Sequence, residues 1–221
     1  MLSKPGAAIT SKQKQLHASL IATAASGAAA LRDEKGRLPL HVAAWHAAPP
    51  TVMRSLLEAY AAAACEPATG SEWLPLHVAL QAKSPAGSSL ALLEAHPAAA
   101  NVAAPYGWLP LHVAARRGAS DDVLHALHEA NPAAARTLCE SGDTPLSLAR
   151  KYGQADAARV LQEIENRYEQ EQAEEERQQQ KRWWQAREDE HQRALEDLVR
   201  KRGEERRLAQ VRLLLMASDG S

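Results

Sequence analysis

Apolar and polar positions recur along the first two thirds of the 221-residue chain with a period of about 35 residues. In each period a proline opens a short run in which apolar residues follow at spacings of three and four, the pattern of one helix face. These prolines are Pro39, Pro75, Pro110 and Pro145. Proline is well tolerated in the first helical turn because its φ is already suitable and its missing N–H is not needed there. Each period therefore predicts a helix that begins at its proline.

A second helix is predicted in each period after a break that contains proline or glycine. Its apolar positions are Val52, Leu56, Leu57, Leu90, Leu92, Leu93, Val123, Leu124 and Leu127. Pro97 and Pro132 are expected to end two of these helices, with a loop leading to the next copy. A fixed period of this size predicts stacked helix-turn-helix units rather than one globular core.

The repeated phrase Leu-Pro-Leu-His resembles the start of the ankyrin repeat, which reads Thr-Pro-Leu-His with a glycine two residues ahead. Gly36, Gly107 and Gly142 match that glycine, and Thr144-Pro145-Leu146 matches the motif itself. Leucine replaces the threonine in three copies, and Pro-Ala-Ala-Ala stands where Gly-Ala-Asp is usual. This wording is similar to the divergent ankyrin repeats of algae and related protists. The resemblance implies a protein-binding module.

We therefore expect an all-α fold, an ankyrin-type solenoid of about four repeats with an N-terminal capping helix and a long C-terminal helix. The expected repeat domain is 16–166, made of a half repeat 16–36 with its cap at Leu16–Ala25, then repeats 37–72, 73–107, 108–142 and 143–166. The remaining expected segments are a flexible basic tail 1–15, a charged helical arm 167–216 and a disordered end 217–221. The basic, Ser- and Ala-containing start also has the composition of an organelle transit peptide.

No proline or glycine occurs from Gln154 to Arg202, and Glu, Gln, Arg, Lys and Ala dominate this stretch. These residues are strong helix formers, so the helix should continue to about Arg202, with a bend or break possible at Gly203. Charge is segregated: 163–176 holds seven glutamates against one arginine, and 200–212 holds six basic residues against two glutamates.

Two sets of residues are candidates for partner binding. On the expected concave side, Arg37, Trp73 and Trp108 precede the phrase, and Trp45 and Arg116 share the end of the first helix. Tryptophan and arginine are common interface anchors, although the tryptophans could instead only cover the next loop. The arm contributes Trp183, Trp184, Leu195, Leu198, Leu208, Val211 and Leu215. The stripe Trp184, His191, Leu195 and Leu198 has the spacing of a short coiled-coil seam, and an ordinary solvated helix is the alternative.

Composition narrows the function further. The formal net charge of −1 gives no nucleic-acid signature, and no apolar run is long enough to span a membrane. Cys65 and Cys139 stand in different repeats, which indicates free thiols in an intracellular, reducing compartment, cytoplasmic or organellar. His41, His77 and His112 recur once per repeat, too far apart to share a metal ion, and in the ankyrin motif this histidine bonds to backbone between repeats.

The chain shows no catalytic, cofactor or metal motif. We expect a non-enzymatic adaptor or structural subunit, in which the repeats bind one protein and the arm binds another protein, a large complex or a second copy of the chain. The alternative is a peripheral membrane or organellar anchor that attaches through the basic, leucine-rich segment Arg200–Met216.

Overall fold

The computed structural model describes residues 10–218, without the side chains of Val211 and of 213–218. Over this range the chain forms α-helices and short 3-10 helices and no strand. The first helices of the repeats are α2 (Pro39–Trp45), α4 (Pro75–Gln81), α6 (Pro110–Arg117) and α8 (Pro145–Lys151). The second-helix row holds α1 (Ser11–Ala25), α3 (Pro50–Ala59), α5 (Ala86–Ala95), α7 (Asp121–Ala130) and the start of α9 (Ala155–Ser218). All four first helices begin at the predicted prolines.

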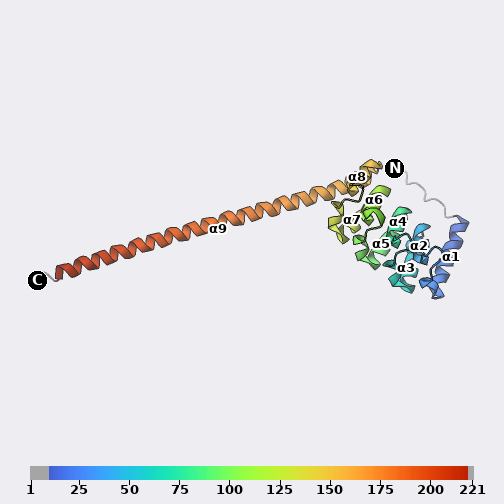
Figure 1. Cartoon of the computed structure of the whole chain (residues 1–221), viewed down its shortest axis with the longest axis horizontal. Helices are drawn as coiled ribbons and strands as arrows, with labels where there is room; N and C mark the ends of the chain where they lie inside the picture. Colours follow the sequence, from blue (N-terminus) through green and yellow to red (C-terminus); the bar gives the residue numbers. More distant parts are fainter. Residues whose placement is uncertain (1–9, 219–221) are drawn as a thin grey trace. The chain divides into compact units, whose positions relative to one another are not determined.

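The helices stack in two rows, as a solenoid requires (Figure 1). In the first row α2 contacts α4, α4 contacts α6 and α6 contacts α8, whereas in the second row α1 contacts α3, α3 contacts α5 and α5 contacts α7. The all-α solenoid and the long C-terminal helix expected from the sequence are thus confirmed.

Leucines and alanines at the predicted spacing form the core between the rows. Leu40, Leu76 and Leu111 are each 1% exposed, and Ala43 and Ala114 are completely buried. Each buried leucine contributes about 1.5–3 kcal/mol relative to an exposed one. The alanines contribute little area themselves, but their small size lets neighbouring first helices approach closely.

The segment after each second helix differs from the expected loop. It forms 3-10 helices, η2 (Ala61–Ala64), η3 (Pro97–Asn101) and η5 (Pro132–Ala135). Their alanines are buried, with Ala99 at 1% and Ala134 at 1% exposure. The prolines do end the preceding helices, but the alanine run then coils tightly because its methyl groups gain contact with the stack. Two further 3-10 helices are η1 (Ala28–Ala30) and η4 (Pro105–Gly107).

The capping helix α1 is longer than the sequence suggested. It begins at Ser11, so residues 11–15, expected in a flexible tail, are helical. The reason is a capping box, in which the Thr10 hydroxyl accepts from the Gln13 N–H and the Gln13 amide oxygen accepts from the Thr10 N–H. Residues 1–9 of the expected tail lie outside the described residues.

The position three residues before each first helix needs a left-handed backbone. Gly36, Gly107 and Gly142 have φ of +70°, +71° and +77°, and in the remaining repeat Glu72 occupies the same position with φ of +55°. A left-handed conformation strains a residue that has a Cβ. The second repeat therefore keeps the turn at a conformational cost that the others avoid.

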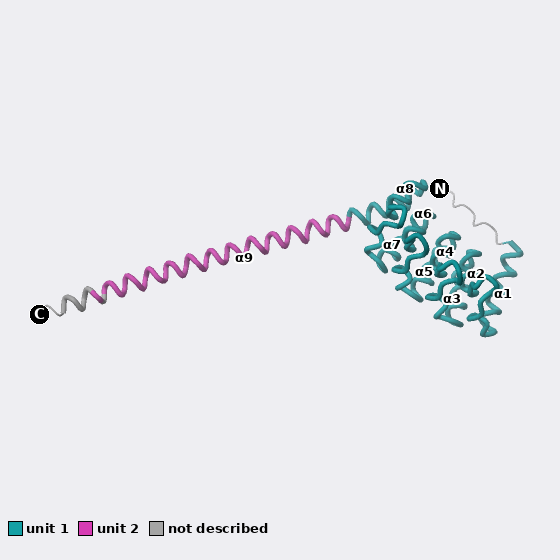
Figure 2. Tube along the Cα trace, viewed as in Figure 1, with its two compact units in different colours: residues 1–166 teal, residues 167–221 magenta. Residues whose placement is uncertain are grey.

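The chain divides into two units, residues up to Asn166 and residues from Arg167 (Figure 2). The first turns of α9 belong to the first unit, where Ala157, Val160, Leu161 and Ile164 are buried. From 166 to 210 every residue of α9 is exposed. The helix does not break at Gly203 and extends two residues past the expected arm to Ser218. Of the expected disordered end, 219–221 lie outside the described residues.

Candidate protein interface

Two positions eight residues apart recur in every repeat: the residue before the repeated phrase and a residue near the end of the first helix. In the third repeat the Arg116 guanidinium carbon lies 5.2 Å from the centre of the Trp108 ring. In the fourth repeat Lys151 Nζ lies 3.0 Å from Asp143 Oδ2. The same two positions hold Arg37 and Trp45 in the first repeat and Trp73 and Gln81 in the second. The two positions are thus in contact in the third and fourth repeats.

A groove of about 470 Å³ lies across the first and second repeats. It is lined by Lys35, Arg37, His41, Trp45, Ala68, Ser71, Trp73, Val78 and Gln81. Trp45 is 57% exposed, an unusual fraction for so large an apolar side chain. Three residues predicted from separate positions in the sequence, Arg37, Trp45 and Trp73, therefore line one groove.

Arg116 also stacks on a residue that the sequence analysis missed. Its guanidinium carbon lies 4.9 Å from the Tyr152 ring centre, so the guanidinium contacts the rings of Trp108 and Tyr152. Tyr152 is 46% exposed and follows α8. The only sequence signal was an aromatic residue just after the end of a first helix. We call Arg37, Trp45, Trp73, Trp108, Arg116 and Tyr152 the aromatic–basic row.

The row is not uniformly exposed. Trp73 and Trp108 are half-buried and pack against the core, with ring centres 5.9 Å from His77 and 6.5 Å from His112. Arg37 is bound by Asp33, whose Oδ2 lies 2.7 Å from Arg37 Nη2 and whose pKa this hydrogen bond lowers. Trp45 and Tyr152 are therefore the exposed members of the aromatic–basic row, while Arg37, Trp73, Trp108 and Arg116 are half-buried.

The repeated histidines connect neighbouring segments of the stack. His41 Nε2 lies 3.1 Å from the Trp73 carbonyl oxygen, and His112 Nε2 lies 3.0 Å from the Thr137 carbonyl oxygen. Burial lowers the pKa of His41 and His77 to about 4, against the opposing effect of neighbouring backbone carbonyls. Burial lowers the pKa of His112 as well. The neutral, buried rings of His41 and His112 bond to backbone and so serve packing, and the His41 bond joins two repeats, as the ankyrin resemblance implied.

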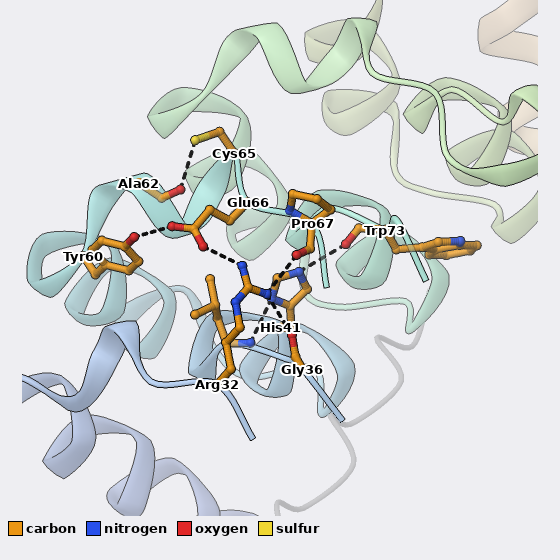
Figure 3. A network of polar contacts seen from close by, with 10 residues as sticks. Arg32, Gly36, His41, Tyr60, Ala62, Cys65, Glu66, Pro67 and Trp73 are labelled. Carbon is orange, nitrogen blue, oxygen red and sulfur yellow. Dashed lines mark hydrogen bonds and ion pairs between the residues drawn. The ribbon is translucent and has the colours of Figure 1, made fainter. Parts of the chain in front are cut away.

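A polar network joins the capping half repeat to the first repeat (Figure 3). Arg32 donates to the carbonyl oxygens of Gly36 at 2.8 Å and Pro67 at 3.0 Å, and its Nη2 lies 2.6 Å from Glu66 Oε2. Tyr60 donates a short hydrogen bond to the other Glu66 oxygen. Arg32 thereby fixes the loop that leads into Trp73, on the edge of the groove.

On the arm, the predicted apolar residues are exposed. Trp183, Trp184, Leu195, Leu198 and Leu208 have exposed fractions between 47% and 69%. The two tryptophan rings meet edge to face at 4.7 Å, and the Arg187 guanidinium lies 5.2 Å from the Trp183 ring centre. The side chains of Val211 and Leu215 lie outside the described residues.

Two other kinds of site, for metal ions and for membrane spanning, are not found among the described residues. Among them no group of three or more His, Cys, Asp or Glu side chains is placed to hold a metal ion. Within the same range, no helix has the length and apolar character needed to cross a membrane. Cys65 is exposed, Cys139 is buried, and both are free thiols.

A helical solenoid with a grooved, aromatic-rich face belongs to the class of repeat proteins that act by binding. Comparison with known families makes this specific: residues 92–149, from α5 to α8, match the sequence model of the family described as ankyrin repeats (many copies). The match covers part of the stack, from α5 to α8, and agrees with the helix pairs seen there. Ankyrin repeats generally mediate protein–protein interaction and are typically non-enzymatic. The comparison with curated proteins gives no match.

Proposed function

We propose that the protein is an adaptor or structural subunit in which the aromatic–basic row binds one protein and the arm provides a second association surface. The observation that carries the first part is the groove beside Trp45, because large aromatic side chains and arginine at a hollow are the usual anchors of an interface. The second part is supported by the exposed apolar residues of α9, among them Leu195, Leu198 and Leu208. The free thiols of Cys65 and Cys139 favour a reducing intracellular compartment.

The test uses full-length variants and affinity capture with quantitative mass spectrometry. Trp45→Ala and Arg116→Ala should each reduce capture of the partner of the repeats about tenfold or more, since hot-spot anchors exceed 1.4 kcal/mol. Ile21→Ala is the matched control, because Ile21 is a large apolar residue of α1 that is 46% exposed and lies outside the row. Equal capture by all three variants would disprove binding through the row.

Binding through the arm is tested separately by Trp184→Glu with Leu195→Glu in the full chain. Proteins bound through α9 should be lost while those bound through the row remain. An identical set of partners for this variant and the native chain would remove the second surface from the proposal.

Membrane attachment is a second candidate because basic side chains and exposed Leu208 lie together near the end of α9. Membrane attachment of this kind predicts that the protein floats with liposomes that contain anionic lipid and does not float with neutral liposomes. Absence from both kinds of liposome would exclude it.

A further inference from the structure

The arm has an apolar stripe along one side. Trp184, His191, Leu195 and Leu198 follow one another at spacings of seven, four and three, which keeps them on one side of an α-helix. Trp184 is 59%, Leu195 47% and Leu198 52% exposed. A helix whose residues over 166–210 are all exposed has apolar surface free to pack on a partner helix.

The charges of the arm restrict what that chain can be. Residues 168–176 hold five glutamates and no basic residue, whereas 200–212 hold six basic residues and two glutamates. If two copies of the arm lay parallel, glutamates would face glutamates and arginines would face arginines. If they lay antiparallel, each acidic run would face the basic run of the other copy. Interhelical charge pairs of this kind set partner choice and orientation.

The positions of the runs agree with the position of the stripe. Asp189 lies midway between the acidic and basic runs, and His191 is the middle of the stripe from Trp184 to Leu198. These two centres are two residues apart, about 3 Å along the helix. A single two-fold axis near residue 190 therefore places acidic runs on basic runs and, at the same time, one stripe on the other.

We propose that two copies of this chain associate through α9 as an antiparallel pair with its two-fold axis near residue 190. This inference rests on the proposed role of the arm as an association surface. It identifies the partner of that surface as a second copy of the chain. In the pair, Trp184 of one copy packs beside Leu195 of the other, and the charge runs fix the direction.

The orientation is measured with spin labels in the full chain, after replacement of the exposed Cys65 by serine. One label per chain is placed by Glu190→Cys or by Gln172→Cys. These exposed positions are five helical turns apart on one side of α9, away from the stripe. An antiparallel pair gives a short inter-chain distance at 190 and a long one, about 54 Å along the axis, at 172. Short distances at both positions mean a parallel pair and would overturn the proposal.

The stripe is tested by molar mass from light scattering. The native chain should have the mass of a dimer, and Leu195→Glu with Leu198→Glu should halve it. Ala186→Glu is the matched control, since it adds a glutamate to the opposite side of the same helix and should leave the dimer intact. A monomeric native chain without inter-chain spin coupling would overturn the proposal. If such a monomer still captured another protein through α9, the adaptor function would stand without the pairing.

Discussion

The stack and the arm are both helical, yet their helices are stable for different reasons. The first and second helices of the repeats are 7 to 10 residues long, too short to be stable alone, and each buries apolar residues against its neighbours. The helix α9 has 64 residues, and beyond Ile164 it relies on helix-forming residues and local charge pairs such as Asp197–Arg200. Tertiary packing therefore determines the stability of the stack, and intrinsic propensity that of the arm.

The largest expected effect is on the stack core. Leu111→Ala should destabilise the stack by about 2–5 kcal/mol, because it leaves a cavity at a side chain that is 1% exposed. Leu195→Ala removes the same atoms from the exposed arm and should change the unfolding of the stack by less than about 0.5 kcal/mol. Urea unfolding followed by near-ultraviolet circular dichroism measures both. Similar losses of unfolding free energy for the two variants would contradict the view that packing stabilises the stack and not the arm.

Acid should destabilise the stack through its histidines. The pKa of His77 is about 4 in the fold against about 6.5 when unfolded, so the folded ring stays neutral while the unfolded ring takes up a proton. The contribution of His77 to the free energy of unfolding is fully present above pH 6.5 and is lost as the pH falls toward 4. By pH 5 the loss amounts to about 2 kcal/mol.

His77→Ser is the matched variant, since Ser147 occupies the equivalent position of the fourth repeat. Its stability should fall less steeply between pH 6.5 and pH 5 than that of the native chain, whatever its stability at neutral pH. Equal slopes in denaturation series at several pH values would show that His77 does not titrate as described.

A substitution in the left-handed turn before α4 should raise the stability of the stack. Glu72→Gly should stabilise the stack by about 0.5–1 kcal/mol, because glycine adopts φ of +55° without the strain of a Cβ. Gly142→Ala is the converse variant, at a position where an added Cβ would meet open space but φ is +77°, and it should cost about 1 kcal/mol. Denaturation midpoints decide, and a loss of stability on Glu72→Gly would refute the interpretation.

The smallest effect on the whole chain is expected at Gly203. Gly203→Ala should stabilise α9 locally by about 1 kcal/mol and leave unfolding of the stack unchanged. Hydrogen exchange gives the local readout: amides near 203 should exchange more slowly in the variant, and amides of 169–182 should exchange faster than those of the repeats. A raised melting temperature of the stack would show that the arm and the stack unfold together.

The sequence predicted best those features that depend on local chemistry. Each first helix begins at its predicted proline, and Leu40, Ala43 and Leu111 are buried as their spacing required. The predicted start of α1 was too late in the chain. Thr10 and Gln13 cap each other at the true start, and the polar composition of 11–15 had suggested a tail instead. The alanine runs were expected as loops because single-residue propensities do not express the contacts that make η3 and η5 coil.

Contacts between distant residues were outside the reach of the sequence. The repeat register gave the equivalent positions of Trp108 and Arg116 but not their contact, and the stacking of Arg116 on Tyr152 joins two repeats. Arg32 and Glu66 are 34 positions apart, and nothing in either neighbourhood indicates the other. The direction of a side chain at a repeat boundary depends on how the repeats pack together. A periodic sequence pattern does not specify that packing.

Both ends of the stack are covered by helices whose outer surfaces are too polar to pack against another repeat. At one end α1 buries Leu20 while Lys12 and Lys14 remain exposed, and at the other the start of α9 buries Val160 and Leu161 while Asp156 and Arg159 remain exposed. Open faces at both ends would let copies add head to tail without limit and form a filament. Polar outer surfaces prevent that growth. The stack is therefore not expected to lengthen by end-to-end addition of further copies.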